Sequence, residues 1–285
     1  MIVSLSIIKS CLLQKGMIIM NKEFSISVDA SLCSRCGSCQ KDCLLGLPKI
    51  NESCAEVINS QACIKCGHCV AICPEGAISI SGFEEAPEVI LDDMTLDPEI
   101  FLAMMKSRRS IRCFKQQDVP LEIIEKIIEA GRYTPTGMNK QGVSYVVLRE
   151  NKDEYERIAV SLWRRLRPII GIFMKQFRYI KINDSFCFKG APVAIVIKSN
   201  NTFVGAVDIV DGALAASAME LMARSYGLGV LYSSAFTNAI KFSGKLRRKL
   251  SINSRREVII TLMIGYPAVK YYRTAQREYP AIKYV

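Results

Sequence analysis

The sequence predicts an α+β fold in two parts, a small cysteine-rich domain and a larger domain in which helices and strands are mixed. Two cysteine runs of identical spacing stand thirty residues apart near the start of the chain. An acidic stretch that contains a proline, residues 82–97, follows them. Beyond Pro98 the hydrophobic pattern alternates between the helical period and the short apolar runs of buried strands. We therefore expect domains at 23–82 and 98–285, a linker at 83–97 and an extension at 1–22.

The extension is apolar over its first nineteen residues but is interrupted by Lys9 and Lys15. It is too short and too broken to span a bilayer, and it lacks the basic start and small-residue cleavage site of a signal peptide. We expect a poorly structured segment upstream of an alternative start at Met17 or Met20. A weak amphipathic anchor is the other interpretation.

Both cysteine runs read Cys-x-x-Cys-x-x-Cys-x-x-x-Cys. The eight residues are Cys33, Cys36, Cys39, Cys43, Cys63, Cys66, Cys69 and Cys73. The duplicated spacing resembles that of bacterial ferredoxins with two 4Fe–4S clusters, in which the fourth cysteine of each run crosses to the other cluster. The resemblance implies one cluster on Cys33, Cys36, Cys39 and Cys73, and the other on Cys63, Cys66, Cys69 and Cys43.

Disulfides and zinc are the other interpretations of these cysteines. A disulfide framework is typical of short secreted chains, whereas this chain has 285 residues. Structural zinc usually takes two Cys-x-x-Cys pairs separated by a longer spacer. Gly37 and Gly67, which precede the third cysteine of each run by two positions, let the backbone turn tightly over a cluster. Clusters and free thiols together predict a cytoplasmic protein.

Charge and histidine content exclude several classes of function. The formal charge of +11 counts cluster thiolates as neutral, and each oxidised cluster with its thiolates carries roughly −2. The densest basic run, residues 245–249, reads as a solvated helix face, so we expect neither nucleic acid nor membrane as a partner. His68 is the one histidine. This excludes Ser-His-Asp triads, histidine-rich metal sites and HExxH proteases.

The elements follow in order from the hydrophobic pattern. Short strands are expected beside the cysteine runs at Phe24–Val28 and Ala77–Ile80. In the larger domain, helices are expected at Pro98–Ser107, Pro120–Arg132, Lys152–Arg165, Phe203–Tyr226 and Ile240–Leu250. Strands are expected at Val143–Leu148, Pro192–Lys198, Val230–Tyr232 and Val258–Ile264. The helix that ends before Gly227 is apolar on more than one side, which favours a dimer interface.

Three arginines and a serine, Arg108, Arg109, Ser110 and Arg112, fall within five residues. The guanidinium group of arginine can donate two parallel hydrogen bonds to phosphate oxygens, so the cluster indicates a phosphate site. A solvated basic helix end is the other interpretation. The segments Thr134–Gln141, Gly227–Gly229 and Gly265–Pro267 follow downstream. In this order and at this spacing, the four segments resemble the FMN-dependent nitroreductase family, from Pro98 to about Tyr284.

The resemblance implies a mixed central sheet flanked by helices, and an interlocked homodimer with FMN at its interface. Arg108, Arg109, Ser110 and Arg112 match the positions that bind the FMN phosphate and ribityl. In the family, a loop that often comes from the partner subunit packs on the flavin ring. Its positions match Pro135, Thr136, Gly137 and Asn139 of this chain. The family's backbone approaches the flavin N5 at positions that match Ser233 and Ser234. A second contact to the phosphate comes from a position that matches Arg277. No catalytic side chain is implied, because the flavin N5 carries the chemistry.

Joined in one chain, the two parts predict a converter of single electrons into electron pairs. We expect an oxidoreductase that passes electrons from ferredoxin or NAD(P)H through two 4Fe–4S clusters to FMN and on to a nitroaromatic, quinone or enone acceptor. Direct reduction by NAD(P)H with ancillary clusters is one alternative. An electron carrier or redox sensor without its own substrate is another. Dehalogenation and flavin destruction are not expected, because a domain of under 190 residues is compact for a long lid.

Overall fold

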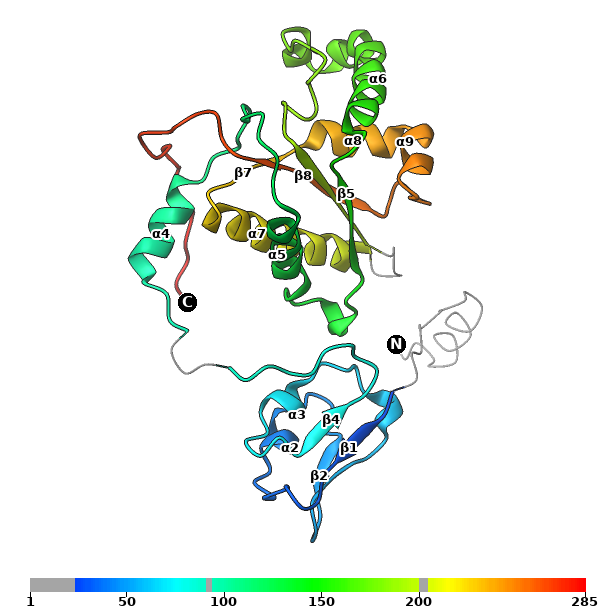
Figure 1. Ribbon diagram of the computed structural model, residues 1–285, viewed down its shortest axis with the longest axis vertical. Helices are drawn as coiled ribbons and strands as arrows, with labels where there is room; N and C mark the ends of the chain where they lie inside the picture. The colour runs from blue at the N-terminus through cyan, green and yellow to red at the C-terminus, as the bar shows by residue number, and fades with distance from the viewer. Residues whose placement is uncertain (1–23, 91–93, 200–204) are drawn as a thin grey trace. The chain divides into compact units, whose positions relative to one another are not determined.

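The computed structural model describes residues 24–90, 94–199 and 205–285 (Figure 1). The chain divides into two compact units, a cysteine-rich unit, Met1–Asp93, and a larger unit, Met94–Val285. The extension expected at residues 1–22 lies outside the described residues. None of the described helices is long and apolar enough to cross a membrane.

The cysteine-rich unit repeats one arrangement twice. Strands β1 (Ile26–Val28) and β4 (Ile78–Ile80) form where the alternating pattern predicts strands, and they pair antiparallel with each other. Helices α2 (Ser38–Asp42) and α3 (His68–Ala71) each begin inside a cysteine run, after Gly37 at φ +77° and Gly67 at φ +76°. A side chain at either glycine would strain this left-handed backbone.

The hairpin of β2 (Pro48–Ile50) and β3 (Ala55–Val57) between the runs was not predicted. The Asn51 side chain closes its turn by accepting hydrogen bonds from the N–H groups of Ser53 and Cys54. A single 3-10 turn, η1 (Ser60–Ala62), leads into the second run.

The larger unit is built on one four-stranded sheet with the order β5-β6-β8-β7. Its strands are β5 (Val143–Leu148), β6 (Val193–Ser199), β7 (Gly229–Tyr232) and β8 (Val258–Gly265). These strands pair antiparallel throughout. A parallel bridge between Ser110 and Val230 adds the arginine segment to the β7 edge and makes the sheet mixed.

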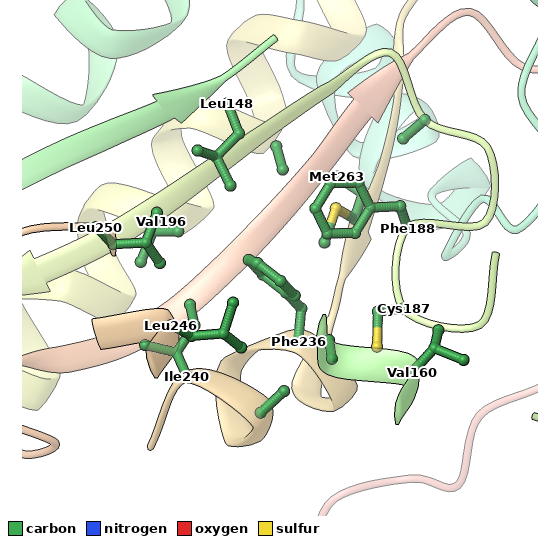
Figure 2. Packing of buried hydrophobic residues seen from close by; sticks show 14 of the residues in the cluster. Leu148, Val160, Cys187, Phe188, Val196, Phe236, Ile240, Leu246, Leu250 and Met263 are labelled. Atoms are coloured by element: carbon green, nitrogen blue, oxygen red, sulfur yellow. The ribbon is translucent and has the colours of Figure 1, made fainter. Parts of the chain in front are cut away.

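Helices cover both faces of this sheet (Figure 1). The helices of the larger unit are α4 (Pro98–Ser107), α5 (Leu121–Arg132), α6 (Lys152–Phe173), α7 (Gly205–Ser225), α8 (Ser234–Phe242) and α9 (Gly244–Lys249), with 3-10 turns η2 (Gly137–Asn139) and η3 (Lys175–Arg178). Helix α4 lies to the side of the sheet (Figure 1) and buries none of its residues. Successive residues of each strand point to opposite faces of the sheet, so they contribute to two separate cores. Ile195 and Leu262 pack with α5 and α7, whereas Val196 and Met263 pack with α6, α8 and α9. Figure 2 shows the second core around Phe236.

Helix α7 lies very close to the sheet. A Cβ atom at Gly212 would come within 2.5 Å of Ile259 Cδ1, so glycine at this position permits the close approach. The helix ends where expected, with Gly227 at φ +73°. The predicted start at Phe203 lies outside the described residues.

Two predicted helices differ from those observed. Helix α6 continues past Arg165 and through Pro168 to Phe173, because Ile170 packs against the core and Gly171 is buried. The prediction of a single helix at Ile240–Leu250 is wrong. Ser243 ends α8 and begins α9, where its Oγ accepts a hydrogen bond from Leu246 N at 3.2 Å.

A buried carboxylate fastens α6 to the loop before β6. The two oxygens of Glu156 accept hydrogen bonds from the N–H groups of Cys187 and Phe188, both at 2.7 Å. Burial raises the Glu156 pKa from 4.5 to about 7, against the opposing effect of these two donors. The native state therefore binds more protons than the unfolded chain between these pH values.

We predict that wild-type stability relative to a Glu156→Gln variant falls as the pH rises from 4.5 through 7, by on the order of 3 kcal/mol at most. The contribution is fully present below the unfolded pKa and is lost above the folded one. Trp163, the one tryptophan, lies on the same helix and reports urea unfolding by fluorescence. If the wild type instead gained stability relative to the variant as the pH rose, the raised pKa of Glu156 would be contradicted.

Candidate functional site

Four thiols from both cysteine runs line one cavity of the cysteine-rich unit. Cys33, Cys36 and Cys39 come from the first run, and Cys73 comes from the end of the second. Cys39 is buried, and burial raises its pKa. The neighbouring Cys36, Cys73 and Cys33 raise it further. The fold thus brings these four sulfurs together across forty residues of sequence.

The second set mirrors the first. Burial raises the pKa of Cys69 to about 11, and the nearby Cys63 and Cys66 add to the effect. Cys43, from the end of the first run, also contributes. Each set therefore combines three cysteines of one run with the fourth of the other.

Peptide N–H groups point at the sulfurs of both sets. Ala55 N donates to Cys33 Sγ at 3.4 Å, Ala77 N to Cys73 Sγ at 3.3 Å, and Lys65 N to Cys63 Sγ at 3.3 Å. Such donors stabilise thiolates. Within residues 24–90 and the rest of the described chain, no three His, Cys, Asp or Glu side chains are close enough to hold a single metal ion. Sulfurs spread around a cavity fit a polynuclear cluster better than mononuclear zinc.

Two side-chain contacts brace the two ligand loops. His68 Nδ1 lies 3.0 Å from Asp42 Oδ2 and ties α3 to α2. The Lys65 ammonium lies over the rings of Phe24 and Phe83, at 5.0 and 4.6 Å from their centroids. This contact joins the two ends of the unit to the second cysteine run.

In the larger unit, the arginine segment runs from the end of α4 along the β7 edge of the sheet. Ile111 N donates to Val230 O at 3.0 Å, and Lys115 N donates to Tyr266 O at 2.8 Å. The segment is thus held between β7 and the turn after β8. Arg112 is exposed, whereas Arg108, Arg109 and Ser110 are half-buried.

Arg108 meets the last turns of α7, and an arginine of α7 reaches back to the end of α4. Arg108 Nη1 lies 3.3 Å from Oε1 of the buried Glu220. Arg224 Nη2 donates to Ser107 Oγ at 2.8 Å, and Arg109 Nη1 donates to Lys106 O at 3.2 Å. Arg109 Nη2 and Arg224 Nε are buried and have no hydrogen-bond partner among the described residues. Buried donors without an acceptor are rare, so this corner fits an anionic group such as phosphate.

The loop from Pro135 to Asn139 is attached to the other end of α7. Gly137 N donates to both carboxylate oxygens of Asp211, at 3.1 and 3.2 Å. A side chain at Gly137 would collide with Val207. Thr136 Oγ1 accepts a hydrogen bond from Gln141 N at 2.9 Å.

This loop is strained. Met138, Asn139 and Gln141 have φ of 53°, 52° and 49°, in the left-handed region that favours glycine. Such strain persists only where the surrounding structure enforces it, and it is concentrated at functional sites. The anchor at Asp211 supplies that enforcement here.

The loop and the arginine segment are held by different parts of α7. Asp211 and Glu220 are nine residues apart on this helix, about 14 Å along its axis. The remaining predicted residues lie elsewhere. Ser233 is buried, donates to Cys187 O and caps α8, while Ser234 is exposed as its first residue. Arg277 lies in the exposed segment after β8.

Sequence reasoning missed the three α7 side chains that hold this site, Asp211, Glu220 and Arg224. A signal was present, because carboxylates are rarely buried without partners and both acidic residues interrupt a largely apolar helix. The sequence alone does not say which side of the helix is covered.

Comparison with known proteins identifies both units. The profile of the Nitroreductase family matches residues 105–266, and a profile for a 4Fe-4S dicluster domain matches residues 25–74. A Methanothermobacter thermautotrophicus protein named "Putative NADH dehydrogenase/NAD(P)H nitroreductase" is 27% identical over 169 residues, which cover 59% of this chain and 77% of that protein. Rat iodotyrosine deiodinase 1 is 24% identical over 209 residues, covering 65% of this chain and 71% of the deiodinase.

Solved structures share the fold of the larger unit. An FMN-dependent nitroreductase of Clostridium difficile R20291 has a TM-score of 0.52 and 18% identity, covering 64% of this chain and 98% of that one. A nitroreductase with bound FMN from Desulfitobacterium hafniense DCB-2 has a TM-score of 0.52 and 21% identity, covering 65% and 97%. Because the family profile extends over more than half of the sequence, the chain belongs to the Nitroreductase family and carries a 4Fe–4S dicluster domain at its N-terminal side.

Proposed function

We propose that this protein is an iron–sulfur flavoprotein oxidoreductase. It passes electrons from a low-potential donor through two 4Fe–4S clusters to FMN, and it reduces a small nitroaromatic, quinone or enone acceptor. One observation carries the proposal. A single chain holds two crossed sets of four thiols together with a nitroreductase domain that presents buried, unpaired guanidinium nitrogens.

In this proposal the cysteine-rich unit is the electron entry. Cys33, Cys36, Cys39 and Cys73 hold one cluster, and Cys63, Cys66, Cys69 and Cys43 hold the other. The clusters supply one-electron transfer at low potential. The peptide donors of Ala55, Ala77 and Lys65 stabilise the negative charge on the ligating sulfurs.

The larger unit binds and orients the flavin. FMN, when bound, collects single electrons and delivers them in pairs to the acceptor. Arg108, Arg109, Ser110 and Arg112 hold its phosphate and ribityl, with Arg277 as a further phosphate contact. Pro135, Thr136, Gly137 and Asn139 cover its ring, and the backbone at Ser233 and Ser234 borders N5. No side chain is assigned as acid or nucleophile.

We further propose that two copies complete each site. The loop and the arginine segment are fastened to opposite ends of α7, so the loop that meets a given arginine segment belongs to the partner subunit. Helix α7 also exposes an apolar stripe that includes Ile209, Val210 and Leu214. Pairing this stripe with its copy, antiparallel, places the loop of one protomer beside the arginines of the other.

A second function class is kept because of one observation. The Methanothermobacter thermautotrophicus relative is named for NAD(P)H, so NAD(P)H could reduce the flavin directly and leave the clusters ancillary. Anaerobic steady-state assays with NADPH and with reduced ferredoxin separate the two. Turnover with NADPH that is unchanged when the clusters are absent favours the alternative.

Removal of one crossed cysteine tests the cluster assignment. We predict that wild-type protein purified anaerobically contains about eight irons per chain, four for each cube, and that Cys73→Ala contains about four. Cys54→Ala is the matched control, since Cys54 lies outside both sets and should retain about eight. Equal iron in the Cys73 variant and the control would show that Cys73 is not a cluster ligand.

Disruption of the α7 stripe tests the shared site. Leu214 is 43% exposed, and we predict that Leu214→Glu yields monomers that purify without FMN, because a charge in the apolar stripe opposes its burial. Light scattering gives the mass and absorbance gives the flavin content. Phe242→Glu is the control, because Phe242 is 63% exposed on α8, across the sheet from α7. Monomers that retain FMN would contradict the shared site.

A further inference from the structure

Arg224 is placed by the fold at the predicted phosphate corner, although it lies more than one hundred residues from the arginine segment. It stands one helical turn after Glu220, which pairs with Arg108. Its Nη2 donates to Ser107 Oγ at 2.8 Å, on the last residue of α4. Arg108, Arg109 and Arg224 therefore surround the same turn of backbone, residues 106–109.

The hydrogen bonds of this corner are incomplete. Ser107 Oγ itself donates to Met104 O at 2.8 Å, and Arg109 Nη1 is satisfied by backbone oxygens. Arg109 Nη2 and Arg224 Nε are two of the three buried side-chain N and O atoms that lack a partner in the described part of the chain. A purely structural tie between α4 and α7 needs Arg224 Nη2 alone, so it leaves the buried Nε unexplained.

The charge of the corner also indicates the ligand. Three guanidinium groups and the Glu220 carboxylate leave a net charge of +2. A phosphate monoester carries about −2 near neutral pH. Glu220 is buried and holds Arg108 in place by an ion pair, which fixes one donor before any ligand binds.

We propose that Arg224 is a phosphate-binding residue of the flavin site and that, with Arg108 and Arg109, it makes the site selective for a phosphorylated flavin. This inference rests on the proposed function and adds to it a residue outside the arginine segment. It predicts that Arg224 contributes binding free energy through the flavin phosphate and not through the flavin ring.

The comparison of FMN with riboflavin tests this directly, since the two differ only in the phosphate. Full-length protein is stripped of flavin, and both ligands are titrated by quenching of flavin fluorescence. We expect Arg224→Met to weaken FMN binding by about tenfold or more, as for loss of a charged hydrogen bond, and to change riboflavin binding less than about twofold. Arg149→Met is the matched control, because Arg149 pairs with Asp118 away from this corner.

A second variant distinguishes the proposed role of Arg224 from an effect of misfolding. Ser107→Ala removes the hydroxyl that positions Arg224 but keeps its charge, and it should lower the FMN-to-riboflavin affinity ratio in the same direction by a smaller factor. If both flavins weaken equally, or the ratio is unchanged in both variants, Arg224 is only a tie between helices and the inference is overturned. Wild-type protein that binds neither flavin would instead overturn the proposed function itself.

Discussion

Helix α7 carries both attachments of the candidate flavin site, and this is the constraint from which the rest of the site follows. Asp211 near one end holds the strained loop through Gly137, and Glu220 near the other holds Arg108. Gly212 lets the helix lie close to β8, so neither attachment moves unless the helix leaves the sheet. In the proposed dimer, the exposed stripe of the same helix would connect the two halves of the site through a second copy.

The cysteine-rich unit depends on a different constraint, the crossing of the two runs. Neither set takes all four of its sulfurs from one run, so the cavity lined by Cys33, Cys36 and Cys39 is completed only when Cys73 reaches it. Pairing of β1 with β4 brings the two ends of the unit together and fixes that approach. The contacts of Lys65 with Phe24 and Phe83 reinforce the same closure. A duplicated sequence thus produces a unit in which each half needs the other.

Most of the fold was predictable because its signals are local. The run of Val143–Leu148 and the proline at the start of Pro98–Ser107 specify their elements without tertiary help. The division at Ser243 and the extension of α6 through Pro168 were not predictable, because a side-chain cap and the packing of Ile170 decide them. Likewise, the arginine segment was visible as a charge run. Asp211, Glu220 and Arg224 acquire their roles only when α7 is placed against α4 and the loop.

We propose that electrons held by the clusters reach the flavin of the same protein. Anaerobic stopped-flow absorbance tests this when holoprotein is mixed with a reduced low-potential donor and cluster bleaching and flavin reduction are followed separately. We expect the clusters to be reduced first and the flavin afterwards, with the second phase abolished when Cys73 is replaced. Clusters that stay reduced beside an oxidised flavin, or flavin reduction that is indifferent to the loss of Cys73, would contradict it.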